Sequence, residues 1–479
     1  MEDSSFTNKN KKHILYDVLY GFVHLTPLEW DLIHTPFFQR LKWIKQLGFS
    51  FYTFHGAEHS RYGHSIGVMH NAHCILKSID RAVSDDELFS GDLKTKEAKL
   101  HQSLRVAALL HDIGTFPFSH TTENSYIRYG ETTNQKNGKG HPDDHEHLGS
   151  FIIKRTNYPG GITSLLLKYG VDPLQISNLV KGIDENIMAN QILHSEIDCD
   201  RMDYLLRDAH YTGLNYGTYD RDYLLYHFKA VKVGEQEILT VNEKALYCIQ
   251  DFLLSRFAWY SQVVRSGRGA KYDALGEEVC FYFLKNKLMY SYSDLLEMIE
   301  KDPVLFFSFN DSYFMGLLQR HYNSDLVQKN HRIRAMIESL LFEISPVVIK
   351  NNIFEQKILM HSDTSYNEKI LKQVSDKLKS MRDFLLKNGD EQDWIIEDLP
   401  KKNIYLLKSA KSVIKDKKQV NVLFERDPTK ILMEDGNVKL LSDMENSMLM
   451  KLQHHFNFIP NVFCSPSAYI RLKEAGFLN

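Results

Sequence analysis

Residues 106–114 read Val-Ala-Ala-Leu-Leu-His-Asp-Ile-Gly. The apolar run predicts a buried helix, and His111 and Asp112 follow it directly. The side chains of adjacent residues on a helix point about 100° apart. A single metal ion can therefore contact both only if it lies between these two directions. Hiding an imidazole and a carboxylate in apolar surroundings carries a high desolvation cost unless something binds them. The stretch therefore predicts a helical core with a polar site built into it.

Two further segments concentrate side chains that can bind a metal. One reads Arg61-Tyr-Gly-His64-Ser, and the other, over residues 194–204, reads His-Ser-Glu-Ile-Asp-Cys-Asp-Arg-Met-Asp-Tyr. A single His-Asp pair is weak evidence, because core and capping roles explain most such pairs. The full order of a histidine, a His-Asp pair and a later aspartate is more specific. Two imidazoles and two carboxylates suit divalent Mn, Mg, Fe, Ni, Co or Zn, with positions left for water and a phosphate oxygen.

The rest of the chain is also dominated by helical patterns. From about residue 25 to residue 385, apolar residues recur mostly at helical spacing, and strand-like runs are few. Pro27 suits the first turn of a helix, and Gly48 suits the end of one. Residues 130–142, rich in Gly and Asn, predict a loop. The polar stretch 387–393 predicts a subdomain boundary.

Beyond that boundary the pattern changes to short strands flanked by helices. The predicted strands are 403–407, 420–424, 430–433 and 438–441, with a turn at Asp435-Gly436. We therefore predict a mainly α fold with a small α+β C-terminal region. The expected division is a flexible tail at 1–11, a core at 12–235, a helical extension that completes the core at 236–386, and the α+β region at 387–479.

Composition excludes few function classes. The chain has 479 residues, 43% of them hydrophobic and 25% charged, and a formal net charge of −3. This balance gives no global electrostatic reason to expect nucleic acid or an anionic membrane as a partner. The five cysteines are far apart, the N-terminus is polar, and the apolar stretches are too short for a membrane span. We expect a cytoplasmic chain with reduced thiols.

Four strings resemble one known family, the HD-domain deoxynucleoside triphosphate triphosphohydrolases, which include the vertebrate SAM-and-HD-domain enzyme and bacterial relatives. The strings are HTPFFQRLKWIKQLG at 34–48, GAEHSRYGHSIGV at 56–68, LHDIGTFPFSH at 110–120 and IDCDRMDYLLRDAHYTG at 197–213. They cover roughly residues 14 to 270 of the chain. Together they are highly specific.

The resemblance implies an HD-domain helical fold with His64, His111, Asp112 and Asp200 as the metal ligands. It also implies that Arg61 grips the triphosphate of a nucleotide. Water activated at this centre is then expected to attack the α-phosphorus of a dNTP, which releases deoxynucleoside and triphosphate. From residue spacing alone, only hydrolysis of a phosphate ester follows.

The same resemblance implies a catalytic group of His120, Glu123 and His145. His120 is expected to donate a proton to the leaving 5′-oxygen, while Glu123 and His145 orient and recharge it. The three-residue spacing of His120 and Glu123 independently places both on one face of a helix. A capping or core role is the alternative for His120. For His145, in the run 141–147, the alternative is an exposed loop or an adventitious metal site.

Gln46, Tyr204 and Asp208 match family positions around the sugar and its 3′-hydroxyl. Asp208 lies two helical turns after Asp200, so both can face one pocket if the segment is helical. A solvated or hydrogen-bonded pair is the alternative for Tyr204 and Asp208.

Some family positions are changed. Thr115 stands where the family has a phosphate-contacting histidine, and Val264 and Gly267 replace a tyrosine and a basic residue. Arg265 and Arg268 could compensate from nearby. Loss of the tyrosine predicts weaker discrimination at the 2′ position.

The sequence says less about regulation and assembly. His34 replaces an aspartate of the family's guanine-reading sites, while Gln39 and Lys42 keep polar positions, so a nucleotide effector stays open. The lysines within 401–418 could bind phosphates or nucleic acid, although a solvated face is the simpler interpretation. The resemblance implies a homo-oligomer, dimer or tetramer.

The sequence thus predicts a metal-dependent phosphohydrolase, with dNTPs as the expected substrates. One alternative is a phosphohydrolase or phosphodiesterase that acts on another nucleotide. The other is a nucleotide- or nucleic-acid-responsive binding protein with vestigial catalysis, although its ligand positions are intact.

Overall fold

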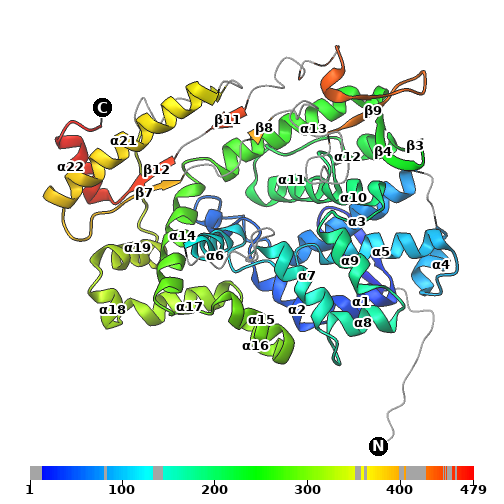
Figure 1. Ribbon diagram of the computed structural model, residues 1–479, viewed down its shortest axis with the longest axis horizontal. Helices are drawn as coiled ribbons and strands as arrows, with labels where there is room; N and C mark the ends of the chain where they lie inside the picture. Colours follow the sequence, from blue (N-terminus) through cyan, green and yellow to red (C-terminus); the bar gives the residue numbers. More distant parts are fainter. Residues whose placement is uncertain are drawn as a thin grey trace, which may run out of the picture.

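The computed structural model describes residues 13–79, 83–132, 144–350, 358–360, 364–398, 404–405, 428–445, 447, 449, 456–458 and 461–478. Helices make up most of these residues, and four small sheets lie among them (Figure 1). The predicted mainly α fold with an α+β C-terminal region is confirmed. The predicted tail, most of the predicted loop at 130–142, the strand at 420–424 and most of the lysine-rich segment lie outside the described residues.

Three helices form the centre of the molecule. They are α3 (Arg61–Ser78), α5 (Lys96–Leu110) and α11 (Cys199–Thr212), and α3 packs against both of the others. Residues 104–110 are buried without interruption, as the apolar run predicts. The helix ends at Leu110, so His111 and Asp112 lie in the turn that follows rather than on the helix itself.

The N-terminal segment differs from the sequence prediction. After the hairpin of β1 (His13–Asp17) and β2 (Gly21–Leu25), α1 (Pro27–Ile33) begins at the predicted proline, and Thr26 and Glu29 form its capping box. The prediction that Gly48 ends a helix is wrong, because Gly48 is the first residue of η2 (Gly48–Tyr52). Instead, the chain breaks into short turns: α2 (Pro36–Gln39), η1 (Arg40–Trp43) and η2.

The physical reason lies in hydrogen bonds that replace helical ones. Thr35 caps α2 before Pro36, which restarts the helix. After η1 the chain is extended, and Lys45 forms a β-bridge with Ser60. Gly48 has a φ of +52° and makes a close approach, because a β-carbon there would lie 2.5 Å from Asp273 Oδ1.

Further helices surround this centre. They are α4 (Asp85–Ser90), α6 (His120–Thr132), α7 (His145–Arg155), α8 (Ile162–Lys168), α9 (Pro173–Val180), α10 (Ile187–His194), α12 (Arg221–Tyr226), η3 (Glu243–Ala245), α13 (Leu246–Trp259), the π-helix η4 (Tyr260–Val264), α14 (Ala270–Lys285), α15 (Tyr292–Lys301), α16 (Pro303–Ser308), α17 (Asp311–Tyr322), α18 (Asp325–Gln328), α19 (His331–Leu341) and η8 (Leu441–Asp443). No helix of the described residues combines the length and apolarity needed to cross a membrane.

One sheet joins distant parts of the chain. The hairpin β3 (Phe228–Val233) and β4 (Gln236–Asn242) is extended by β9 (Lys430–Leu432), which runs parallel to β4, and by β10 (Val438–Leu440). β9 and β10 pair as antiparallel strands, and Gly436 between them has a φ of +84°. This confirms the two predicted strands and the turn that joins them.

The C-terminal elements form a second, smaller core (Figure 1). Its helices are α21 (Thr364–Asn388) and α22 (Pro466–Glu474), which contact each other. Its strands are β5 (Val347–Val348), β12 (Asn461–Cys464) and β7 (Ile395–Asp398), in that order, beside a sheet of β6 (Ile358–Met360), β11 (Phe456–Phe458) and β8 (Ile404–Tyr405). A division at residue 387 would therefore separate α21 from the helix it packs against.

Candidate active site

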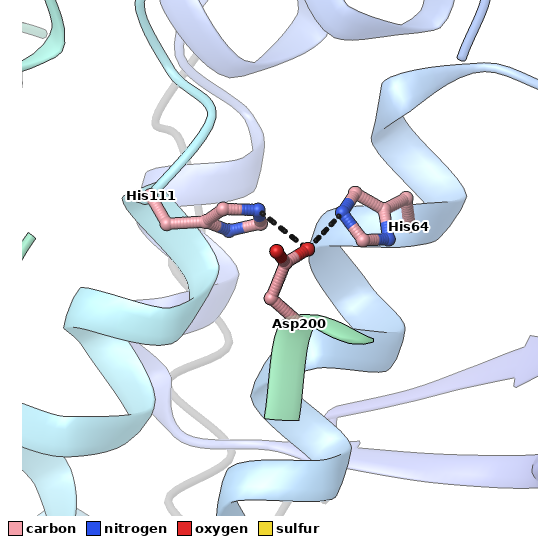
Figure 2. A group of neighbouring side chains, drawn as sticks. All are labelled: His64, His111 and Asp200. Atoms are coloured by element: carbon pink, nitrogen blue, oxygen red, sulfur yellow. Dashed lines mark ion pairs between the residues drawn. The ribbon is translucent and has the colours of Figure 1, made fainter. Parts of the chain in front are cut away.

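The four expected metal ligands converge from three places in the fold. His64 comes from α3, His111 from the turn after α5, and Asp200 from the first turn of α11 (Figure 2). Asp112 directly follows His111 in the same turn. His64 Nε2 lies 3.0 Å and His111 Nε2 lies 3.8 Å from Asp200 Oδ1. The same two nitrogens lie 3.7 and 3.4 Å from Asp112 Oδ2. The structure thus gathers His64, His111 and Asp200 around one point, with Asp112 Oδ2 close to both imidazole nitrogens.

Both imidazoles are held so that Nε2 faces this point. His64 Nδ1 donates to Asp203 Oδ2 at 2.7 Å, and His111 Nδ1 donates to the carbonyl of Ala108 at 2.8 Å. Both Nε2 atoms are buried, and among the described residues they face the carboxylates of Asp112 and Asp200 at 3.0 to 3.8 Å. Two buried ring nitrogens beside carboxylates, each ring fixed through its other nitrogen, fit a divalent cation.

The electrostatics of the cluster favour positive charge. Burial lowers the pKa of His64, but hydrogen bonds and charges from Asp200 and Asp203 outweigh it and raise that pKa to about 9. Burial raises the pKa of Asp112, but Arg61 and His111 hold it well below its usual value. The centre therefore holds carboxylates that stay ionised at neutral pH, and these attract a proton or a cation.

Arg61 connects the metal cluster to the next segment. Its Nη1 donates to Asp112 Oδ2 at 2.7 Å, and its Nε donates to Ser119 Oγ at 2.9 Å. Ser119 Oγ in turn donates to the carbonyl of Lys45 at 2.6 Å. Phe118 and Ser119 have φ values of +52° and +56°, an unusual backbone for residues other than glycine. This strained turn precedes His120, the first residue of α6.

Glu123 bridges the two expected catalytic histidines. Its Oε2 accepts from His120 Nδ1 and its Oε1 accepts from His145 Nδ1, each at 2.6 Å. Burial lowers the pKa of His145, but Glu123 outweighs it and raises that pKa to about 10. Burial raises the pKa of Glu123, but the two histidines hold it well below its usual value. Because Nδ1 of both rings is engaged, Nε2 of each is left for proton transfer.

A cavity of about 520 Å³ unites these groups. Its walls contain most of the predicted site residues: Gln46, Arg61, His111, Asp112, His120, His145, Asp200, Tyr204 and Asp208. His64 and Glu123 are not among the lining residues, because each lies behind a group that it contacts. The volume is in the range of small-molecule sites.

The structure shows where the residues that differ from the family pattern lie. Val264 lines the cavity, whereas Thr115 is buried away from it and its hydroxyl has no partner among the described residues. Gly267 lies against the C-terminal strands, since a β-carbon there would sit 3.3 Å from Val348. Arg265 does not line the cavity and instead donates to Asp398 Oδ1 at 2.8 Å. Its expected compensation for the lost basic residue is therefore wrong.

Arg201 supplies the second guanidinium of the cavity wall, and the sequence prediction missed it. Arg201 directly follows Asp200 in the sequence, and this position could have indicated that it lies at the site. His34, Gln39 and Lys42, considered for an effector, lie outside the cavity lining.

Two aspartates far along the chain also escaped the prediction, the partly buried Asp273 and the buried Asp311. Asp273 Oδ1 accepts from the Phe49 amide at 2.9 Å and from Thr121 Oγ1 at 2.6 Å. Asp311 Oδ1 accepts from the Phe118 amide at 2.6 Å, and its Oδ2 accepts from the Lys45 amide. Burial raises the pKa of each to about 7. They tie the strained turn to the segment around Gln46.

Comparisons with known proteins cover the part of the chain that holds most of these residues. The family model described as HD domain matches residues 61–208. The Bacillus subtilis protein YwfO is 34% identical over 256 residues, which is 53% of this chain and 52% of that protein. Human "deoxynucleoside triphosphate triphosphohydrolase SAMHD1" is 25% identical over 268 residues, 51% of this chain and 40% of that protein. The chain thus matches about half the length of these relatives.

A crystal structure of a phosphohydrolase from Bacteroides thetaiotaomicron covers 95% of this chain and 100% of its own, with a TM-score of 0.63 and 19% identity. A structure from Aquifex aeolicus has the same TM-score, 22% identity and 98% coverage of this chain. At these identities the two structures show the fold alone. The sequence matches add that residues 61–208 fit the HD domain model and that about half of the chain is similar to YwfO and to the SAMHD1 triphosphohydrolases.

Proposed function

We propose that the protein is a metal-dependent phosphohydrolase that converts dNTPs to deoxynucleoside and triphosphate. The observation that carries the proposal is the pair of buried Nε2 atoms of His64 and His111, which face the carboxylates of Asp112 and Asp200 on the wall of a cavity. The Glu123-bridged histidines face the same cavity. Homology to proteins named as dNTP triphosphohydrolases supports the choice of substrate.

His64, His111, Asp112 and Asp200 would hold the divalent cation, whether Mn, Mg, Fe, Ni, Co or Zn. When bound, such a cation polarises a phosphoryl oxygen and lowers the pKa of water. Arg61 would bind the phosphates, because its guanidinium is fixed by Asp112 and Ser119 and lines the cavity.

His120 would act as the general acid. As the bond forms between the water oxygen and the α-phosphorus, the bond from phosphorus to the 5′-oxygen breaks, and His120 Nε2 donates its proton to that oxygen. Glu123 accepts from Nδ1 of the same ring and thereby fixes the orientation of that ring. His145, on the other oxygen of Glu123, would keep that carboxylate ionised and oriented.

Gln46, Tyr204 and Asp208 would surround the sugar, since all three line the cavity. Tyr204 packs against Trp259 with ring centroids 4.7 Å apart, which forms an aromatic wall.

A second candidate is a phosphohydrolase that also accepts ribonucleotides or other phosphate esters. Val264 favours it, because a valine on the cavity wall offers no hydroxyl to read the 2′ position. A binding protein with vestigial catalysis has less support, because the ligand positions and the Glu123 bridge are all present. A cytoplasmic dimer or tetramer stays a prediction, and light scattering after size exclusion measures the assembly.

The test is product analysis. Purified protein is incubated with each dNTP, each NTP and a generic phosphodiester, with Mn or Mg, and the products are separated by chromatography. Deoxynucleoside plus triphosphate is the expected result, and Asp200→Asn should abolish it. Asp222→Asn, at a carboxylate whose side chain is 90% exposed, is the matched control and should retain full activity. Diphosphates or monophosphates would favour the second candidate, and no product from any substrate would refute the proposal.

A further inference from the structure

We propose that His59 is the positioning residue of the sugar end of the cavity: its side chain fixes Asp208 so that the free carboxylate oxygen receives a sugar hydroxyl of the substrate, and its backbone carbonyl holds the backbone of Gln46. The inference rests on the proposed function, because it assumes that a nucleotide occupies the cavity. His59 does not itself line the cavity, so it would act only through these two residues.

His59 contacts both residues with different parts of itself. Its backbone carbonyl accepts from the backbone N–H of Gln46 at 3.0 Å. Its Nε2 lies 2.7 Å from Asp208 Oδ1, with both side chains almost fully buried. A carboxylate can only accept, so Nε2 must carry the hydrogen. The side chain of His59 thus fixes the side chain of Asp208, while its backbone carbonyl holds the backbone of Gln46, 162 positions before Asp208 in the chain.

The side chains of Gln46 and Asp208 each keep an unused acceptor. Gln46 Oε1 and Asp208 Oδ2 are buried, and neither has a hydrogen-bond partner among the described residues. Gln46 and Asp208 are 7% and 1% exposed, so leaving these oxygens unpaired is costly. The group that satisfies them must be a donor. In a nucleotide, the sugar hydroxyl is a donor without charge that lies between the base and the phosphates.

The ring of His59 is itself held in place. It stacks on Tyr211 with centroids 4.6 Å apart and ring planes 11° apart. Its Nδ1 is buried with no partner among the described residues, so Nε2 makes the ring's polar contact. Asp208 is therefore fixed through Oδ1, and its Oδ2 is left in a constant position for the ligand. A preformed acceptor of this kind rejects an analogue that lacks the hydroxyl.

The test compares a 2′-deoxynucleoside triphosphate with its 2′,3′-dideoxy analogue. The wild-type protein should favour the deoxy substrate in kcat/KM by about 10- to 100-fold, as expected for a hydrogen bond to a charged acceptor. His59→Leu, which removes the N–H donor but keeps the backbone carbonyl, should bring this ratio close to one. His59→Gln, which can place an N–H near the same position, should restore most of the ratio.

The ratio separates positioning from a merely structural role. If His59→Leu lowers turnover of both substrates equally and leaves the ratio unchanged, His59 only supports the fold and the inference is wrong. A wild-type ratio close to one would also overturn it, and this measurement needs no variant to fold. If the wild-type protein hydrolyses neither substrate, the proposed function has failed and the inference falls with it.

Discussion

Asp203 determines how His64 is presented to the metal centre. Its Oδ2 accepts from His64 Nδ1, and the carboxylate is fixed in turn by Arg207 Nε at 2.8 Å and by the Tyr20 hydroxyl at 2.9 Å. Asp203 is fully buried, so this network is shielded from water. A carboxylate behind a ligating histidine fixes the ring and raises its basicity.

Asp203→Asn should therefore lower the affinity for a divalent metal by about 10- to 100-fold, because the side chain keeps its size and loses its charge. Calorimetric titration of the metal-stripped protein with Mn measures the change. Asp222→Asn serves as the control and should bind as the wild type does. Equal affinity in Asp203→Asn and wild type would show that the network does not tune the site.

The Glu123 bridge predicts a pH dependence of stability. The pKa of His145 is about 10 in the folded protein, against about 6.5 for an unperturbed histidine. The raised pKa of His145 therefore contributes to the free energy of unfolding. This contribution is fully present below about pH 6.5 and is lost as the pH rises through about 10. The lowered pKa of Glu123 adds a loss at acid pH, below about 4.5.

In urea unfolding between pH 6.5 and 9.5, the wild-type free energy should decline more steeply than that of Glu123→Gln. The glutamine cannot supply the charge that raises the pKa of His145. Parallel curves for the two proteins would contradict the bridge.

Local spacing explains which site residues could be predicted. His111 and Asp112 are adjacent, and His120 and Glu123 are one helical turn apart, so their proximity is encoded in short strings. Asp273 and Asp311 hold backbone amides more than 190 positions away, and such contacts leave no local pattern. His59 stood inside a quoted string, but only the structure pairs it with Asp208.

At the scale of elements, the approach of α3 to α11 depends on Gly67. A β-carbon there would lie 1.8 Å from Asp203 Oδ1 and 2.6 Å from Arg207 Nη2. The two helices carry His64 and Asp200, so their separation sets the width of the metal centre.

Gly67→Ala should force α3 and α11 apart, which destabilises the protein by at least about 1–3 kcal/mol and weakens metal binding. Thermal unfolding and metal content measure both effects. Gly316→Ala in α17 is the matched control: its β-carbon would meet nothing within 4 Å, so stability should hold or rise by up to about 1 kcal/mol. A Gly67→Ala protein as stable as wild type would mean that the helices can adjust.

The segment 34–48 shows why helical spacing alone was misleading. Its apolar residues recur at the helical period, yet Thr35 and Pro36 restart the helix, and the Gln46 amide bonds to His59 instead of to a preceding turn. The spacing of apolar residues indicates which face of a segment is buried. The backbone conformation depends on which hydrogen bonds compete with those of the helix.

At the scale of the whole molecule, the metal centre links helices that are distant in sequence. His64 and Asp200 are 136 positions apart, and His111 lies between them. Binding that requires the folded arrangement stabilises it by mass action.

Removal of the metal with a chelator should therefore lower the melting temperature as well as abolish turnover. The expected loss is about 2.7 kcal/mol relative to protein in metal at 100 times its dissociation constant. Restoring Mn should recover both properties. A melting temperature insensitive to chelation would indicate that the ligands are not joined by a metal.

The C-terminal region also illustrates what sequence could predict at this scale. The strands at 430–433 and 438–441 were recognised from local pattern, and the structure confirms them. The pairing of β9 with β4 was not predicted, because the parallel contact of Ile431 with Val241 is long-range and leaves no local sequence pattern.

That pairing has a consequence for the order of synthesis. Val241 and Ile431 are 190 positions apart, so the edge of β4 leaves the ribosome long before β9 is made. At translation rates of about 5–20 residues per second, the unpaired edge would be exposed for roughly 10–40 s. Exposed strand edges attract other chains. The nascent protein thus passes through a stage at which a chaperone, or a slower ribosome, would have most effect on its yield.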